Sequence, residues 1–429
     1  MKRSTASGKF ALKPVVVAVA LATGAAWAAP TPNQMPGAGR VEALSLAGQV
    51  QVNGSGVLAV GTTITGLANG SRIDVYGKVV LNWGITGLLD PTNPHGFNLG
   101  SNATLFFGAV SGGGEDPPAV LNVDVSGNPS QIYGNLISTN TAWANCGLCN
   151  TAPAIFLANA NGIVVGAGGR IVAPTGVGLI GADMTGATSI NEFIGNNGWV
   201  IPAAPSYGNS YVSFGTIPAT GNVTIAGAIN GDFVVNKEAL YILVAGNNID
   251  VLNTGNLFGR TVVLSGGLVA APTLQAVGGL SSQTVNRLFD VDAGNEEACC
   301  GVGTASGDLA IVPGITGNVV NEGSISVVNG VVDREWISIQ ATGNVRSGIQ
   351  GDGNTLVGLF ADRGIEIDLY SDTGKVELYN VVSGYTSSQS LLGMVVNRNA
   401  TYSGFAPDVT IDALTPGAQA SSIASRRAP

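Results

Sequence analysis

Six charged residues near residue 370 are the strongest candidates for acid–base chemistry in this sequence. They are Asp362, Arg363, Glu366, Asp368, Asp372 and Glu377. Enzymes that cleave polysaccharides need paired carboxylates, often beside a basic residue, to protonate a leaving group or to remove a proton. The same stretch alternates with Ile365, Ile367 and Leu369, which is typical of the solvated face of one β-strand. We therefore expect no enzymatic activity and keep a polysaccharide lyase or hydrolase as the alternative function.

A second stretch, FLANANGIVVGAGGRI at 156–171, has no acid, base or metal ligand beside its polar residues. Asn and Gly tolerate the positive φ angles that sharp bends require. We expect Asn159, Asn161 and Gly162 to turn a corner, and Ile163–Val165 to begin the next strand. The Gly-rich run at 166–169 would then turn the chain again.

Residues 1–28 have the features of a secretory signal peptide. Four basic residues precede the apolar run VVVAVALA, and the sequence Ala26-Trp27-Ala28 is typical of a cleavage site. Cleavage would leave Ala29 as the first mature residue. The apolar run is too short to span a bilayer, so we expect an exported protein without stable membrane insertion.

Composition favours an all-β, repetitive fold. The 429 residues include 63 Gly, and only 10% are charged, against roughly 25% in typical soluble domains. β-Branched residues and turn formers are abundant. Loss of the signal segment would lower the formal net charge from -9 to -13, because that segment has four basic residues and no acidic ones. Nucleic acid and anionic lipid are therefore not expected as partners.

The single histidine and the four cysteines suggest no catalytic, metal or cofactor site. His95 lies in a Pro- and Gly-containing loop, which does not favour a Ser-His-Asp hydrolase. Cys146 and Cys149 form the sequence CGLC, and Cys299 and Cys300 are adjacent. In an exported chain we expect short local disulfides, in preference to a zinc site or a thioredoxin-like redox motif.

Short alternating runs recur along the chain and end in Asn or Gly. Examples are GNVTIAGAIN from 221, NNIDVLNTGNLFG from 247 and GNVVNEGSISVVNG from 317, spaced within the range that indicates a solenoid. We predict a right-handed parallel β-helix with an N-terminal cap and extra-helical β excursions. In it, Val223 and Ile225 would stack on Ile249 and Val251 of the next turn.

Several segments, in order, resemble the N-terminal two-partner-secretion domain of filamentous haemagglutinins. They are Asn82-Trp83 followed by FNLG (97–100), AVLNVDVSGNPSQIYGNL (119–136), FLANANGIVVGAGGRI (156–171), and NTGNL (253–257) followed by RTVVLSGG. The resemblance covers roughly residues 40–270. Ala160 stands where the family has Pro.

The resemblance implies export through a dedicated outer-membrane β-barrel transporter with periplasmic docking domains, and folding outside the cell. It suggests five recognition residues: Asn128, Pro129, Asn159, Asn161 and Gly162. The alternative is that they only turn the chain. The family also implies an adhesin with receptors on host or bacterial surfaces, either secreted or held at the cell surface. We expect a monomer.

These observations divide the chain into four parts. Residues 1–28 are the signal peptide, 29–310 the secretion domain, 311–405 further β-helix rungs, and 406–429 a disordered tail. Two stretches interrupt the repeat and are expected to leave the solenoid, at 182–216 and 272–307.

Overall fold

The fold is taken from a computed structural model of the chain. It describes residues 28–84, 96–109, 118–139, 152–195, 217–230, 239–269, 316–327, 336–348, 358–361, 366–371, 376–379, 381–383, 392–397 and 409–412. Residues 1–27, which belong to the predicted signal peptide, lie outside these ranges. So do His95, all four cysteines, Asp362, Arg363 and Asp372.

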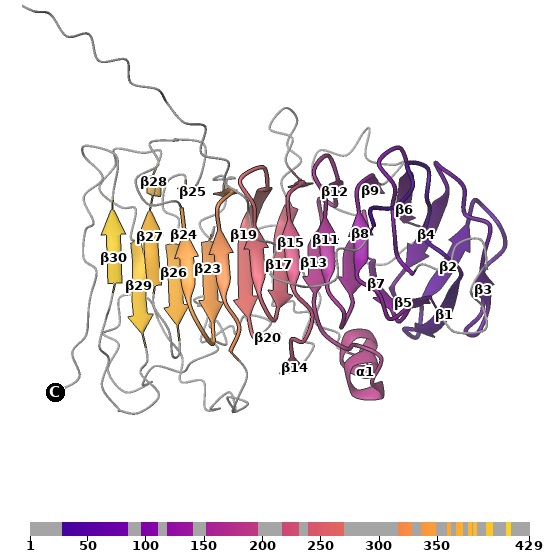
Figure 1. Cartoon of the computed structure of the whole chain (residues 1–429). Coiled ribbons are helices and arrows are strands. Elements are labelled where there is room, and N and C mark those ends of the chain that lie inside the picture. Colours follow the sequence, from indigo (N-terminus) through magenta and orange to yellow (C-terminus); the bar gives the residue numbers. More distant parts are fainter. Residues whose placement is uncertain are drawn as a thin grey trace, which may run out of the picture.

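Three ladders of parallel strands form the sides of a coil (Figure 1). The first ladder is a sheet of eight short strands that pair in register, each with the next. Its strands are β8 (Ser130–Ile132), β11 (Ile163–Val165), β15 (Val223–Ile225), β18 (Ile249–Val251), β21 (Val319–Asn321), β24 (Val345–Ser347), β27 (Val376–Tyr379) and β30 (Val409–Asp412).

The second and third ladders belong to one larger sheet. The second ladder contains β4 (Arg72–Tyr76), β6 (Thr104–Ala109), β9 (Asn135–Thr139), β12 (Arg170–Val172), β16 (Ala228–Ile229), β22 (Ser324–Val327), β25 (Gly358–Ala361) and β28 (Val381–Ser383). The third contains β5 (Lys78–Trp83), β7 (Ala119–Asp124), β10 (Ala154–Ala158), β13 (Val177–Ile180), β17 (Ala239–Gly246), β23 (Trp336–Ala341), β26 (Glu366–Ser371) and β29 (Leu392–Asn397).

Strand β19 (Asn256–Gly266) joins the second and third ladders. Its first residues pair with β16 and β22, and its last with β17 and β23. The chain visits the three ladders in turn, as in β11, β12, β13 and then β15. One such three-sided turn is called a rung below. The parallel β-helix predicted from the sequence is confirmed.

An antiparallel cap closes the N-terminal end of the coil. Strand β1 (Gly39–Leu44) pairs antiparallel with β3 (Thr63–Ile64) and with β5, and β2 (Gln49–Val52) pairs antiparallel with β4. A small sheet of β14 (Ile217–Pro218) and β20 (Leu268–Val269) forms outside the ladders. Both the cap and the extra-helical β pairing agree with the prediction.

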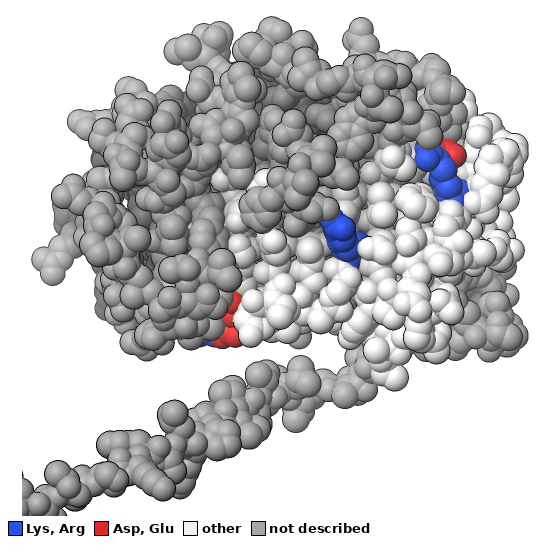
Figure 2. Space-filling model, turned by 90° about the horizontal axis from the view of Figure 1, so that it is seen from above, with Lys and Arg blue, Asp and Glu red and all other residues white. Residues whose placement is uncertain are grey.

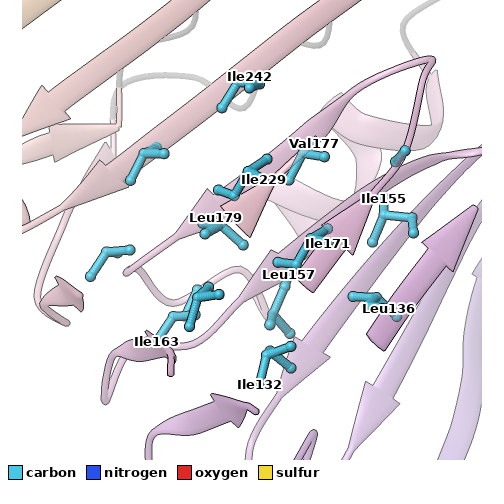
Figure 3. Close-up of a cluster of buried hydrophobic side chains, with 14 of the residues drawn as sticks. Ile132, Leu136, Ile155, Leu157, Ile163, Ile171, Val177, Leu179, Ile229 and Ile242 are labelled. Carbon is cyan, nitrogen blue, oxygen red and sulfur yellow. The ribbon is translucent and has the colours of Figure 1, made fainter. Parts of the chain in front are cut away.

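The core is a set of aliphatic columns inside the coil (Figure 3). Ile155 pairs with Val177 and Val177 with Ile242, and all three side chains are buried. Neighbouring columns are built in the same way. The predicted stacking is confirmed, because Val223 pairs with Ile249 and Ile225 with Val251, all fully buried.

The third ladder is buried on its outer face as well. Leu121, Phe156 and Ile180 alternate with the inward residues and form a second apolar cluster. This explains why β7, β10 and β13 are nearly continuous apolar runs, a pattern typical of parallel strands covered on both sides.

Helix α1 (Ala187–Gly195) packs on this outer face and was not predicted. It lies within 182–216, which the sequence analysis assigned to an excursion from an all-β fold. Phe193 of the helix is buried, and its ring contacts Phe156 edge to face at 5.9 Å. The fold is mostly β, as predicted, and the helix is an addition to it in which Ile190, Phe193 and Ile194 share one face.

Candidate functional site

The predicted recognition residues meet at one corner of the coil, where the third ladder turns into the first. Asn128 and Pro129 lie in the turn from β7 to β8, and Asn159, Asn161 and Gly162 lie in the turn from β10 to β11. The two turns belong to adjacent rungs, since β7 pairs with β10 and β8 with β11. We call this set of two turns the motif corner.

Asn159 is the hub of the motif corner and is 1% exposed. Its side-chain amide donates to the Asn128 carbonyl at 2.8 Å and to Ser130 Oγ at 3.0 Å. Its Oδ1 accepts the Asn161 N–H at 2.8 Å, and its own carbonyl accepts the Gly162 N–H at 3.0 Å. One side chain thus closes its own turn and fastens it to the turn below.

Asp124 occupies the rung below and is 3% exposed. Its carboxylate accepts the Phe97 N–H at 2.8 Å, the Ser126 N–H at 3.0 Å and the Ser130 hydroxyl at 2.7 Å. A carboxylate saturated by internal donors is not available to a substrate, so this arrangement is suited to holding a corner together.

The remaining four predicted residues differ in accessibility. Gly162 has φ of 108°, and a Cβ there would approach the Asn222 carbonyl to 2.7 Å, so the position requires glycine. Pro129 is buried and Asn128 half-buried, whereas Asn161 is exposed. Asn161 is therefore the member of this set whose side chain a partner could reach most directly.

A buried polar chain connects the other motif residues to the same region. Trp83 Nε1 donates to Asn122 Oδ1 at 3.0 Å, and Asn122 donates to the Phe156 carbonyl at 3.1 Å. Trp83 also contacts Phe97 edge to face at 5.4 Å. The three segments that carry most of the sequence resemblance thus converge, although the sequence analysis had singled out neither Asp124, Asn122 nor Ser130.

Farther along the coil, asparagines form a ladder at the same corner. Asn248, Asn318 and Asn344 each donate their backbone N–H to Oδ1 of the asparagine on the preceding rung, beginning at Asn222. These bonds measure 3.1, 3.1 and 2.8 Å. The ladder continues across the 70 positions that separate Asn248 from Asn318, so it holds the register on both sides of a long insertion.

Charged residues on the first ladder form a small cluster. Arg346 makes an ion pair with Glu322 at 2.5 Å. Burial, reinforced by the nearby charge of Glu322, raises the pKa of Asp250, and Arg346 opposes this shift. Figure 2 shows one face of the molecule, on which few of the described residues are charged.

The structure separates the residues proposed for polysaccharide cleavage. Glu366 and Asp368 lie on β26 of the third ladder, whereas Glu377 lies on β27 of the first. Glu377 is in register with Arg346 of β24. Within the described ranges, no group of three or more His, Cys, Asp or Glu residues is placed to hold a metal ion.

The predicted cleavage site lies at the start of the described chain. Ala28 and Ala29 are both exposed, and the Ala28 carbonyl accepts a bond from Gln131 Nε2 at 3.2 Å. Among the described residues, no helix is long and apolar enough to cross a membrane. The predicted disulfides fall outside the described ranges.

Comparison with solved structures finds similar chains, of which one is described here. No family model and no curated protein match the chain. The crystal structure of the HMW1 secretion domain from Haemophilus influenzae aligns over 85% of this chain and 83% of that chain, with 14% identity and a TM-score of 0.37. The fold assigned here rests on the strand pairing and not on this alignment.

Proposed function

We propose that this protein is the exported passenger of a two-partner secretion system. In this proposal residues 1–28 direct the chain to the periplasm, and a dedicated outer-membrane barrel with periplasmic docking domains recognises residues 29–310. The mature chain folds outside the cell, stays secreted or surface-bound as a monomer, and acts as an adhesin.

The observation that carries the proposal is the convergence of motif segments. FNLG, AVLNVDVSGNPSQI and FLANANGI resemble one secretion-domain family in sequence, and Phe97, Asp124 and Asn159 from these segments share one hydrogen-bonded corner. Weak turn motifs would not be expected to meet in space by chance. Their meeting supports treating the resemblance as one unit.

The stacked rungs also suit passage through a pore followed by folding. Each rung pairs with its neighbours, so a chain emerging in order could add rungs one at a time. Burial of one rung's inward aliphatic side chains would offset the ordering entropy of that rung. Folding outside could then favour outward movement without another energy source.

Secretion in the presence and absence of a co-expressed barrel partner tests the proposal. We expect the full chain to reach the medium or cell surface only with the partner, and the released product to show a β-rich circular dichroism spectrum. Equal release without any barrel partner would contradict the proposal.

Asn161→Ile tests whether the motif corner takes part in recognition. The side chain is exposed, so the purified variant should fold, and we expect its secretion to fall. Thr185→Ile, in an exposed loop outside the corner, is the control. Normal secretion of a folded Asn161→Ile variant would leave the corner with a purely structural role.

A further inference from the structure

The exposed large apolar side chains in the described part of the chain all lie in the N-terminal cap. Leu46 is 108% exposed, Val57 is 55% exposed and Val60 is 57% exposed. The cap forms one end of the coil, where β1, β2 and β3 lie in Figure 1. Single exposed apolar residues are common on protein surfaces, whereas their concentration at one place indicates an interaction surface. We call Leu46, Val57 and Val60 the cap tip.

Leu46 stands in a tight turn between β1 and β2. The Gly48 N–H donates to the Ser45 carbonyl at 2.7 Å, and the Ser45 N–H donates to the Lys78 carbonyl of β5 at 2.9 Å. The turn is therefore fastened to the coil while Leu46 projects from it. Its exposure of 108% means that the side chain is as open to solvent as in an extended peptide. Contact with an apolar medium would remove this unfavourable exposure to water.

Val57 and Val60 lie in the segment that leads from β2 to β3. This segment is bonded to both of the longer cap strands, because the Leu58 N–H donates to a β2 carbonyl at 2.9 Å and the Gly61 N–H to a β1 carbonyl at 2.8 Å. The Leu58 side chain packs against the main core cluster. The fold thus buries one apolar residue of the segment and holds Val57 and Val60 in solvent.

The cap tip is also free of charge. Residues 43–71 contain no charged residue. The charges that flank this stretch are paired, since Arg40 bonds Glu42 at 2.6 Å and Arg72 bonds Asp74 at 2.5 Å. The whole chain, in contrast, has a formal net charge of -9. The cap tip is therefore a neutral apolar surface on an acidic protein, and its transfer into an apolar medium would take no ion out of water.

We infer that the cap tip inserts reversibly into the surface of a zwitterionic phospholipid membrane. Acyl chains close around single projecting side chains in any arrangement, whereas a protein partner needs a surface of matching shape. The net negative charge of the chain disfavours anionic lipid, so a bilayer surface without net charge is the partner that fits. The contact is peripheral and is made by the folded protein after release.

This inference deepens the adhesin part of the proposed function, on which its biological meaning rests. It names the class of surface that the released protein touches. The binding itself is a property of the folded cap and needs no transporter, so it can be measured separately from secretion.

Flotation of the refolded mature chain, residues 29–429, with phosphatidylcholine vesicles tests the inference. We expect the chain to float with these vesicles, and to bind less when phosphatidylserine is added at low salt. Leu46→Gln, Val57→Thr and Val60→Thr together should lower the partition coefficient at least about tenfold, because three apolar contacts with the bilayer are lost. Unchanged binding by this triple variant, folded by circular dichroism, would overturn the inference.

Ala47→Trp tests the same surface in the opposite direction. Ala47 is exposed beside Leu46, and tryptophan prefers the interface between lipid and water. We expect this variant to bind the vesicles more tightly than the native chain. Asn253→Trp, at an exposed position in the turn after β18, is the matched control and should bind as the native chain does. Equal binding by the two tryptophan variants would overturn the inference.

Sedimentation in the absence of lipid distinguishes a membrane site from a site for a second copy of the chain. The native chain and the triple variant should both be monomers. A native dimer that the triple variant loses would assign the cap tip to self-association and overturn the inference.

The outcomes also separate this inference from the secretion proposal. Loss of vesicle binding would leave the secretion proposal standing, because the assay contains no transporter. Release that does not depend on a barrel partner would overturn the secretion proposal, and the vesicle measurement would be unaffected.

Discussion

At the scale of single residues, Asn159 and Asn161 lie two positions apart in one turn and have opposite environments. The Asn159 side chain is buried and satisfies groups on two rungs, whereas Asn161 is exposed, and its side chain makes one long contact of 3.4 Å. When a buried hydrogen-bonding side chain is removed, its former partners have neither a protein group nor water to bond. The folded state is destabilised as a result.

Asn159→Ala should therefore destabilise the folded protein by about 2–4 kcal/mol, since the Asn128 carbonyl, the Ser130 hydroxyl and the Asn161 N–H lose a partner. Urea unfolding followed by circular dichroism measures the change. Asn161→Ala is the matched control and should stay within about 0.5 kcal/mol of the native protein. Equal effects of the two changes would contradict the role assigned to Asn159.

Asp250 gives a prediction for pH dependence. Burial and Glu322 raise its pKa above the ordinary 3.8, so the folded state holds this proton more tightly than the unfolded chain does. Its contribution to stability is favourable at low pH and is lost as pH rises above 3.8 through the raised value.

Asp250→Asn should consequently stabilise the protein at pH 7, and the gain should shrink as pH is lowered towards 3.8. Thermal midpoints of both chains across this range measure it. In a chain that already has Glu322→Gln, adding Asp250→Asn should give a smaller gain in stability than it gives in the native chain. The reason is that the repulsion between the two carboxylates is already gone. A gain that grows on acidification would contradict this assignment.

At the scale of elements, α1 covers the outer face of the third ladder. Phe193 is 1% exposed and contacts Phe156 of β10. Phe193→Ala should destabilise the protein by about 3–5 kcal/mol, the usual cost of removing a buried aromatic ring. Thr188→Ala, on the exposed side of the same helix, should have little effect, and similar losses for both would argue against this packing.

The sequence predicted the strands and corners better than the contacts between them. Alternation in GNVTIAGAIN placed Val223 and Ile225 inward, and the Asn and Gly residues at 159–162 marked a bend, because both signals are local. Helix α1 was missed because its apolar face is complementary to Phe156, more than thirty residues away. The role of Asp124 likewise depends on Phe97 and on the pairing of β7 with β10.

At the scale of the whole molecule, the antiparallel cap and the repeated rungs predict different responses to truncation. A chain that ends at residue 269 keeps the cap and several complete rungs, so it should remain folded, since each rung depends mainly on its neighbours. A chain that lacks residues 28–76 loses the cover over the first rung and should be unfolded or aggregated.

Circular dichroism and size-exclusion chromatography of the two shortened chains compare these outcomes. Folding of the chain without residues 28–76, or loss of β structure in the chain that ends at 269, would contradict a fold closed by its cap and built by local stacking.

Asn248 and Asn318 are 70 positions apart, yet they are directly bonded neighbours, and Ile249 and Val319 resume the column of the first ladder. The coil therefore tolerates a long detour of chain between two consecutive turns without losing its alignment. Such a point is a suitable place to graft an unrelated peptide, such as an epitope or a small binding module.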